Sequence, residues 1–382
     1  MTSKIVTPLS ELKTRSSSKW RRFAPDVLPM HVAEMDYDIA ENIKQLLLDK
    51  VSNSDLGYTG PMPEVTEGFV KFAERLWGWK VDAKQVRLST DVGVSAVELL
   101  RALGKKGDRV VINSPVYHSF FDWVAEVGME IYDVPLQRSE SSWELDLDGL
   151  ENAFKNGAQF YLICNPHNPL GKVFTETELA SVAVLAKKYQ VTVISDEIHA
   201  PLTYSSKNFV PFLSVSEVAQ EVGVCITAAS KSFNLAGLKA SVIVTASATM
   251  HEKLAKLPAA LHWRSGLLGA FAMGEAFANG QDWLDSAIAA IQESRELLIR
   301  LLAEHVPAVQ TWIPEAGYLA WLDVSALALG DNPAAKLISE QKVAFVPGTD
   351  HGSEYVNFVR INFACHPESL ERAVKALAAY AS

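Results

Sequence analysis

Cysteine is scarce in this chain, which has only three in 382 residues. Cys164, Cys225 and Cys365 lie far apart, and no C-x-x-C pair occurs. An odd number of widely spaced cysteines argues against a disulfide framework and against a structural zinc site. Two of the three lie in apolar, strand-like runs, so we expect small buried hydrophobic side chains.

Long hydrophobic runs are also missing. The nearest candidate for a membrane span, Leu257–Phe277, is interrupted by His262, Arg264 and Glu275, whereas a span needs about 20 apolar residues. The segment Met1–Arg15 is polar and lacks the apolar core of a secretory signal. We therefore expect no membrane partner and a cytoplasmic location.

Positive charge is not in excess. Asp and Glu number 45 against 35 Lys and Arg, for a net charge of −10, which argues against nucleic acid as a partner. The sequence has no H-E-x-x-H, G-x-S-x-G, G-x-G-x-x-G or P-loop motif, and its nine histidines show no metal-ligand spacing. We expect no metal site.

What is present indicates a globular α/β protein. Hydrophobic residues make up 48% of the chain, and its length is enough for two domains or for one large and one small domain. Helix and strand patterns alternate from about residue 85 to 245, with strands expected at Arg109–Asn113 and Glu130–Pro135. A capping box at Thr175–Glu178 opens a helix. This alternation predicts a mostly parallel central sheet with helices on both faces.

The last hundred or so residues follow a different pattern. A long amphipathic helix is expected over Asp282–His305. Short strands are expected at Tyr318–Val324, Val343–Val346 and Asn357–Phe363, before a final helix at about Glu368–Tyr380. This pattern predicts a smaller α/β domain.

Polar side chains follow three of the apolar runs that read as buried strands. Because ligands of open α/β sheets bind outside the carboxyl ends of the strands, these side chains are expected to converge. A lysine that forms an imine, an aspartate for a ring nitrogen and an asparagine for a ring oxygen suit pyridoxal 5′-phosphate (PLP). The sites and the runs before them are Asn165 after Phe160–Cys164, Asp196 after Val191–Ser195, and Ser230-Lys231 after Val222–Ala229.

Other residues complete this hypothesis. Asp91–Val94 opens a helix whose free amides suit a phosphate, and Tyr117 could stack on a cofactor ring. Arg360 lies in an alternating strand, and its planar fork matches a carboxylate. His199 either orients Asp196 or caps the following turn. Two asparagines, Asn165 and Asn168, compete for the ring oxygen, and chain position alone favours Asn165.

The motifs together resemble a known family. The chain is similar to fold-type I PLP enzymes of the class I/II aminotransferase superfamily, and within it to the MalY/PatB-type cystathionine β-lyases, which are C–S lyases. The motifs span nearly the whole chain. They are Leu28–Tyr37, Gly57-Tyr58-Thr59, Pro115–His118, Cys164–Pro169, Ser195–His199, Ser230–Gly237 and Val359–Asn362.

The resemblance implies a role for each matching residue. Lys231 forms the imine with PLP, Asp196 binds the ring nitrogen, and Tyr117 stacks on the ring. For the ring oxygen the resemblance favours Asn168. Gly93, Val94 and Ser230 bind the phosphate, with Tyr58 reaching in from the other subunit of a homodimer with shared sites. Arg360 binds the substrate carboxylate, and Tyr58 also contributes to substrate binding. Lys239 is an additional phosphate anchor. The implied domains are 48–280 for PLP binding and 1–47 with 281–382 for the small domain.

The activity implied by the resemblance is α,β-elimination of cystathionine or related S-substituted cysteines. An aminotransferase using the same residues is the alternative, and a regulatory protein that binds a transcription activator is an alternative of another class. The segment His31–Tyr37 departs from the usual Trp-Val-Ala-Asp-Met-Asp-Phe of the family, which bears on substrate choice.

Overall fold

The computed structural model describes residues 5–381, whose contacts group them into two compact units. The larger unit comprises residues 39–167 and 173–284. Among the described residues, the smaller unit comprises residues 5–38, 168–172 and 285–381. The domain limits at residues 48 and 280 remain a proposal.

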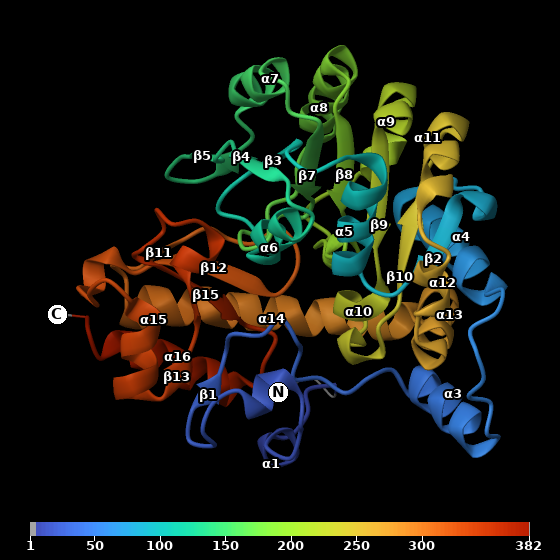
Figure 1. Cartoon of the computed structure of the whole chain (residues 1–382). Coiled ribbons are helices and arrows are strands. Elements are labelled where there is room, and N and C mark those ends of the chain that lie inside the picture. Colours follow the sequence, from blue (N-terminus) through green and yellow to red (C-terminus); the bar gives the residue numbers. More distant parts are fainter. Residues whose placement is uncertain (1–4, 382) are drawn as a thin grey trace. The chain divides into compact units, whose positions relative to one another are not determined.

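The larger unit is built on a seven-stranded sheet (Figure 1). The strand order is β2-β10-β9-β8-β7-β3-β4. Strands β4, β3, β7, β8 and β9 pair in parallel, and β10 pairs antiparallel with both β9 and β2. The mostly parallel sheet is therefore confirmed. Its strands are β2 (Val86–Ser89), β3 (Arg109–Ile112), β4 (Glu130–Asp133), β7 (Phe160–Cys164), β8 (Thr192–Asp196), β9 (Gly223–Thr227) and β10 (Ser241–Val244).

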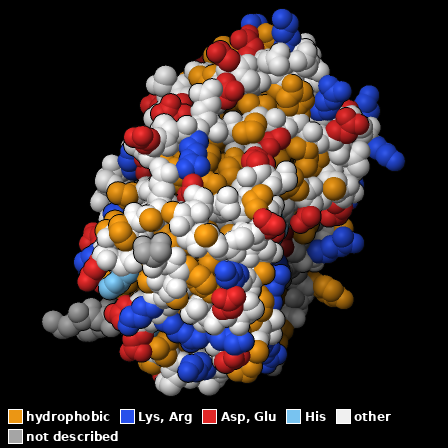
Figure 2. Space-filling view, turned by 90° about the vertical axis from the view of Figure 1, so that its left-hand side faces the viewer, with side chains coloured by type: hydrophobic (Ala, Val, Ile, Leu, Met, Phe, Trp, Pro, Cys, Tyr) orange, Lys and Arg blue, Asp and Glu red, His pale blue; other side chains and the backbone are white. Residues whose placement is uncertain are grey.

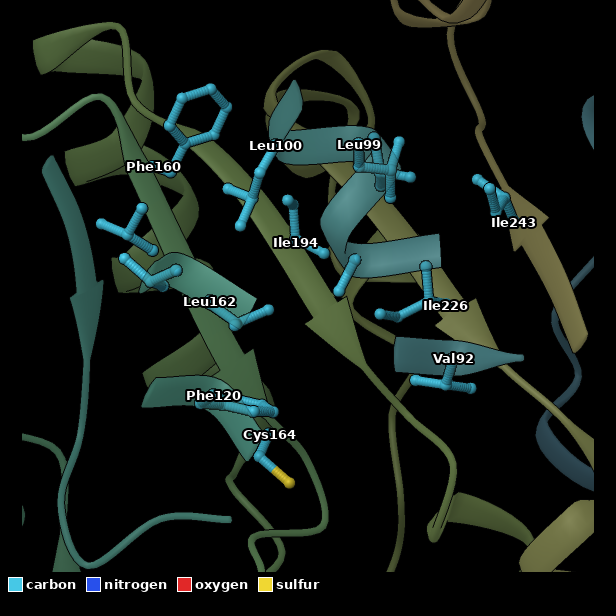
Figure 3. Packing of buried hydrophobic residues seen from close by; sticks show 14 of the residues in the cluster. Val92, Leu99, Leu100, Phe120, Phe160, Leu162, Cys164, Ile194, Ile226 and Ile243 are labelled. Atoms are coloured by element: carbon cyan, nitrogen blue, oxygen red, sulfur yellow. The ribbon is translucent and has the colours of Figure 1, made fainter. Parts of the chain in front are cut away.

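Alternate strand residues face the two layers of helices. On one face, α5 (Val92–Leu103) and α6 (Ser119–Glu126) pack on the sheet, and Figure 3 shows Leu100 beside Ile194. The neighbouring residue Val193 is also fully buried, and β8 contacts α8 (Glu176–Tyr189). Burial on both faces explains why these strands are continuous apolar runs.

The helix α8 begins where the sequence predicts. The Thr175 side chain accepts from the Glu178 N–H, and the Glu178 carboxylate accepts from the Thr175 N–H, which makes a complete capping box. The helix connects β7 to β8.

The larger unit contains further α-helices besides α5, α6 and α8. α13 packs against both α3 and α4. The bounds are α3 (Glu41–Ser52), α4 (Pro63–Trp77), α7 (Leu147–Lys155), α9 (Glu217–Val222), α10 (Ala229–Ser232), α11 (Ala248–Lys253), α12 (Ala260–Trp263) and α13 (Leu267–Asn279). A small hairpin pairs β5 (Gln137–Arg138) with β6 (Trp143–Glu144). The long helix α14 (Gln281–His305) begins in this unit and continues in the smaller one.

The smaller unit holds an antiparallel sheet of four strands in the order β11-β12-β15-β14. The expectation of a single strand over Val343–Val346 is wrong, because the chain changes partner at Phe345: β13 pairs with β1, and β14 pairs with β15. The elements are α1 (Leu9–Leu12), α2 (Ser18–Arg21), β1 (Leu28–Pro29), β11 (Gln310–Thr311), β12 (Leu319–Asp323), α15 (Pro333–Lys336), β13 (Val343–Ala344), β14 (Val346–Pro347), β15 (Phe358–Asn362) and α16 (Pro367–Ala378).

No helix within residues 5–381 is both long and apolar enough to cross a bilayer. In the same residues, no group of three or more His, Cys, Asp or Glu side chains is placed to hold a metal ion. On the face shown in Figure 2, acidic and basic side chains are interspersed.

Candidate active site

Three neighbouring strands bring the expected polar residues to one edge of the sheet. In the register, Cys164 is opposite Asp196, and Asp196 is opposite Ile226. The Asn165 N–H donates to the Asp196 carbonyl at 2.9 Å, so the end of β7 is tied to the end of β8. Lys231 lies close enough to Asp196 for its positive charge to favour the ionised carboxylate. The structure thus brings Asn165, Asp196 and Lys231 together.

Asp196 is a buried carboxylate with little compensation from its own chain. Burial raises its pKa from 3.8 to about 7, against the opposing effects of the Ile198 N–H and the Lys231 charge. Its Oδ1 accepts from the Ile198 N–H at 3.1 Å. A buried carboxylate is costly unless a cation or several donors stabilise it. The site is therefore prepared for a cationic hydrogen-bond donor.

Lys231 is held by a short helix and a tight turn. It is half-buried within α10, and the Leu235 N–H donates to the Ser230 carbonyl at 3.1 Å. Asn234 adopts a positive φ of 59°, which Asn tolerates better than most residues. Phe233 is fully buried and stacks on Trp283 with ring centroids 5.7 Å apart. The buried Phe233 ring anchors the turn that carries Lys231.

The start of α5 is occupied by the chain's own carboxylate. The Asp91 Oδ1 accepts from the Val94 N–H at 2.8 Å, and Lys239 Nζ lies 3.1 Å from Asp91 Oδ2. Val94 was expected to offer this N–H to a phosphate. Phosphate binding at Val94 therefore requires Asp91 to release the N–H, and Lys239 is placed to neutralise Asp91.

Three hydroxyl groups fix α5 on the sheet. The Ser95 hydroxyl donates to Ser89 Oγ at 2.8 Å and lies 3.2 Å from Ser241 Oγ. All three serines are fully buried, and they come from α5, β2 and β10. We call them the serine cluster. The cluster holds the first turn of α5 against two strands.

Tyr117 is connected to the start of α5 through Trp123, a residue that the sequence analysis did not single out. The Tyr117 and Trp123 rings make an edge contact with centroids 5.8 Å apart. A Cβ at Gly93 would meet Trp123 at 3.0 Å, so the indole packs closely on the Gly93 backbone. Trp123 therefore fixes both Tyr117 and the helix terminus.

The two asparagines have different partners. Asn165 is fully buried, its Oδ1 accepts from the Phe174 N–H at 3.1 Å, and its Nδ2 has no hydrogen-bond partner among the described residues. In the smaller unit, Asn168 Oδ1 accepts from Arg360 Nη1 at 3.2 Å. That bond leaves the Asn168 NH₂ group as the donating end of the carboxamide.

Arg360 is buried in the centre of β15, with 3% of its surface exposed. It lies opposite Trp321 on one side and Val346 on the other. Its Nη2 donates to the His31 carbonyl at 2.9 Å. A guanidinium held this way matches a carboxylate ligand.

His31 is a buried residue of the smaller unit, and its burial could not be predicted from the sequence. Its exposed fraction is 5%, and neither ring nitrogen has a hydrogen-bond partner within residues 5–381. Its pKa is lowered from 6.5 to about 4, mainly by burial and also by the nearby charges of Arg22, Lys19 and Arg360. His31 is therefore a neutral imidazole in an electropositive region of the smaller unit.

Tyr58 stands apart from these residues. Its side chain is 97% exposed, in a segment without regular structure. The adjacent residues are anchored, because Thr59 Oγ1 donates to the Ser265 carbonyl at 2.9 Å and His262 Nε2 bonds the Gly60 carbonyl at 3.0 Å. The structure does not bring Tyr58 to Lys231 within this chain.

His199 is buried next to the site and precedes the helix η2 (Ala200–Leu202). Its side chain makes no capping hydrogen bond to that helix, so the structure does not support the capping alternative. A role in orienting Asp196 remains a prediction.

The residues of the larger unit fit PLP. A buried carboxylate that lacks a full cationic partner suits a protonated ring nitrogen, and a half-buried lysine beside it suits an aldehyde. A side chain at Gly93 would crowd the Trp123 indole, so glycine suits this position in the first turn of α5. The mostly parallel seven-stranded sheet of the larger unit is that of fold-type I PLP enzymes.

The chain belongs to the family described as aminotransferase class I and II, whose model matches residues 25–377. It is 32% identical to the cystathionine beta-lyase PatB of Bacillus subtilis, over 93% of this chain and 92% of that one. It is 31% identical to a cystathionine beta-lyase of Corynebacterium glutamicum, over 97% and 98% of the two chains. Among solved structures, cystalysin of Treponema denticola, which contains a PLP cofactor, matches with a TM-score of 0.90 and 27% identity over 99% of both chains.

Proposed function

We propose that this protein is a PLP-dependent C–S β-lyase that acts on L-cystathionine or related S-substituted cysteines. The observation that carries the proposal is the Asp196–Lys231 pair at the strand ends of a chain whose full-length relatives are named cystathionine beta-lyases. The overall reaction adds one water and yields a thiol, pyruvate and ammonia.

When bound, PLP supplies an aldehyde that condenses with amines and a ring that withdraws electrons from the substrate Cα. Lys231 would hold the aldehyde in the resting enzyme and, once released, take the proton from Cα. Desolvation suits both tasks, because a less solvated lysine more readily becomes the neutral amine. Asp196 would keep a proton at the ring nitrogen, and its burial makes it a strong proton acceptor.

The remaining residues would bind and orient. Arg360 would bind the substrate α-carboxylate, and the NH₂ group of Asn168 would donate to the ring oxygen. Tyr117, fixed by Trp123, would lie against the ring. The phosphate would be held by the backbone of Gly93 and Val94, by Ser230 and by Lys239.

We further propose a cytoplasmic homodimer with shared sites. The 97% exposure of Tyr58, on a segment that is otherwise anchored, supports a contact with a second subunit. Tyr58 would there complete the phosphate site of the partner.

An aminotransferase is the second candidate, because the family is named for aminotransferases, an aspartate aminotransferase of Bacillus sp. is 24% identical to this chain, and the same residues would begin either reaction. The lyase needs no keto acid, whereas amino transfer does. We therefore expect the purified protein with PLP to release pyruvate from L-cystathionine without any added keto acid. A panel of S-substituted cysteines, followed by a lactate dehydrogenase assay, would rank the substrates. No pyruvate, but transfer of the amino group to an added keto acid, would favour the aminotransferase.

A further inference from the structure

Glu197, the residue after Asp196, is a second buried carboxylate at the end of β8. It is 1% exposed. Its Oε1 accepts from the Ser195 hydroxyl at 2.9 Å and from the Phe212 N–H at 2.9 Å. The Cys225 thiol also hydrogen bonds to it. A carboxylate with three donors is built into the fold rather than left over from the surface.

The backbone of Glu197 is tied to the neighbouring strand as well. Its N–H donates to the Ile226 carbonyl at 2.9 Å, and its carbonyl accepts from the Thr227 hydroxyl at 3.1 Å. Glu197 therefore joins β8 to β9 directly beside Asp196. Its side chain extends this connection to the helix η3 (Phe212–Ser214).

The charged groups around Glu197 are few. Asp196 on β8 carries like charge and favours protonated Glu197, and Cys225 on β9 is a neutral donor whose pKa burial raises. Lys231 favours ionised Asp196, and η3 contributes only Phe212, Leu213 and Ser214. Burial raises the pKa of Glu197 from 4.5 to about 7, against the effects of its three donors. Glu197 thus changes charge near neutral pH, one residue from Asp196.

We propose that Glu197 is a positioning residue for Asp196, which fixes the end of β8 and, when ionised, adds a negative charge that favours a proton between Asp196 and the ring nitrogen of bound PLP. The inference rests on the proposed function. Asp196 and Glu197 are adjacent and carry like charge, and Asp196 raises the pKa of Glu197; a negative charge on one therefore favours protons and cations at the other. The second charge therefore stabilises a cationic ring nitrogen that Asp196 alone would hold less firmly.

Glu197→Gln separates the two roles, because the amide oxygen can still accept from Ser195 and Phe212 but carries no charge. The probe is PLP labelled with ¹⁵N in its ring, bound to wild type and variant, with the ¹⁵N chemical shift and kcat/KM measured from about pH 5.5 to 9. Below pH 7, where Glu197 is neutral, the two proteins should agree. Above pH 7, the PLP ring nitrogen in the variant should lose its proton about one pH unit lower than in wild type. In the same range the kcat/KM of the variant should be about tenfold below that of wild type.

Two further variants serve as controls for the effect of Glu197→Gln. Ser195→Ala removes one donor to ionised Glu197 and keeps the charge, so the pH-dependent change should move to higher pH. Glu221→Gln removes an exposed carboxylate on α9 and should behave as wild type. A Glu197→Gln protein that matches wild type at every pH, or that loses activity equally at every pH, would overturn the proposal. The ¹⁵N measurement needs only bound cofactor, so absence of pyruvate from wild type would count against the lyase reaction and not against Glu197.

Discussion

Arg360 and Asn168 share a hydrogen bond of 3.2 Å although they are 192 residues apart. Both are buried in the smaller unit. The proposed ligand of the substrate carboxylate thus orients the proposed donor to the cofactor ring oxygen. Substrate binding and cofactor polarisation would be linked through this one contact.

Arg360→Ala should lower kcat/KM for every amino-acid substrate, whatever its sulfur substituent. Removing one partner of a desolvated charge pair costs roughly 2–5 kcal/mol, which corresponds to on the order of 10²-fold or more. Kinetics on several thioethers check this, with circular dichroism to verify folding. Arg372→Ala, which removes a guanidinium that bonds the Asp26 carbonyl, is the matched control. A loss confined to one thioether would mean that Arg360 reads the side chain.

Lys231→Ala should abolish covalent attachment of PLP. Reduction of the wild-type complex with borohydride should attach the cofactor to Lys231, as detected by peptide mass spectrometry, because the lysine is the expected nucleophile. The variant should show no attachment and almost no turnover. Lys187→Ala, an exposed lysine on α8, should retain both. Attachment at another lysine would remove Lys231 from the proposed mechanism.

Asp196→Asn should lower kcat by roughly 10²-fold or more, because an amide cannot hold the ring proton, and a charge-assisted bond at a buried site contributes about 2–4 kcal/mol. The same change should stabilise the cofactor-free protein at high pH. The pKa of Asp196 in the folded protein is raised from 3.8 to about 7, so the folded state holds this proton more tightly than the unfolded state. The free energy of unfolding that this contributes is fully present below about pH 4 and is lost as the pH rises through 7.

Chemical denaturation of the cofactor-free proteins at pH 5 and pH 8 tests this second effect. The gain in unfolding free energy from Asp196→Asn should be larger at pH 8, by a few kcal/mol at most. An equal gain at both pH values would show that Asp196 is ionised throughout this range.

Asp91→Asn should tighten the binding of PLP several-fold. The asparagine oxygen can still cap the Val94 N–H, but the negative charge near the phosphate disappears and Lys239 is released. Lys239→Ala should weaken binding. Fluorescence titration with PLP measures both effects, and pyridoxal, which lacks the phosphate, is the control ligand. Equal changes for PLP and pyridoxal would show that this pair does not act on the phosphate.

A mixed dimer tests the role of Tyr58. Tyr58→Ala and Lys231→Ala are each expected to be inactive or nearly so. If sites are shared, one site of the mixed dimer carries both changes and the other carries neither. After subunit exchange, activity should return to about half the native value per mixed dimer. Verified exchange without recovered activity would place Tyr58 in the site of its own chain, or outside it.

Strong local signals made much of the larger unit predictable. The run Phe160–Cys164 is a strand over its whole length, because burial on both faces selects uninterrupted apolar residues. The capping box at Thr175 has both of its hydrogen bonds. Since the ends of parallel strands meet at one edge, the proximity of Asn165, Asp196 and Lys231 also followed from the pattern.

Contacts between distant residues could not be read in the same way. Lys239 and Asp91 are 148 residues apart, and nothing local marks their ion pair. The change of partner between β13 and β14 depends on pairing with β1, near the other end of the chain. Glu197 was passed over because a buried glutamate and an exposed one look alike until the donors from Ser195 and Phe212 are in place.

The serine cluster affects how the phosphate group of the cofactor would bind at the first turn of α5. Because Ser95 is bonded to Ser89 and close to Ser241, the first turn of α5 is immobilised when the sheet forms. The ordering entropy of that turn is incurred during folding and not during ligand capture. Replacing hydroxyls in the cluster should therefore lower the association rate and the affinity of the cofactor before it changes the chemistry at Lys231.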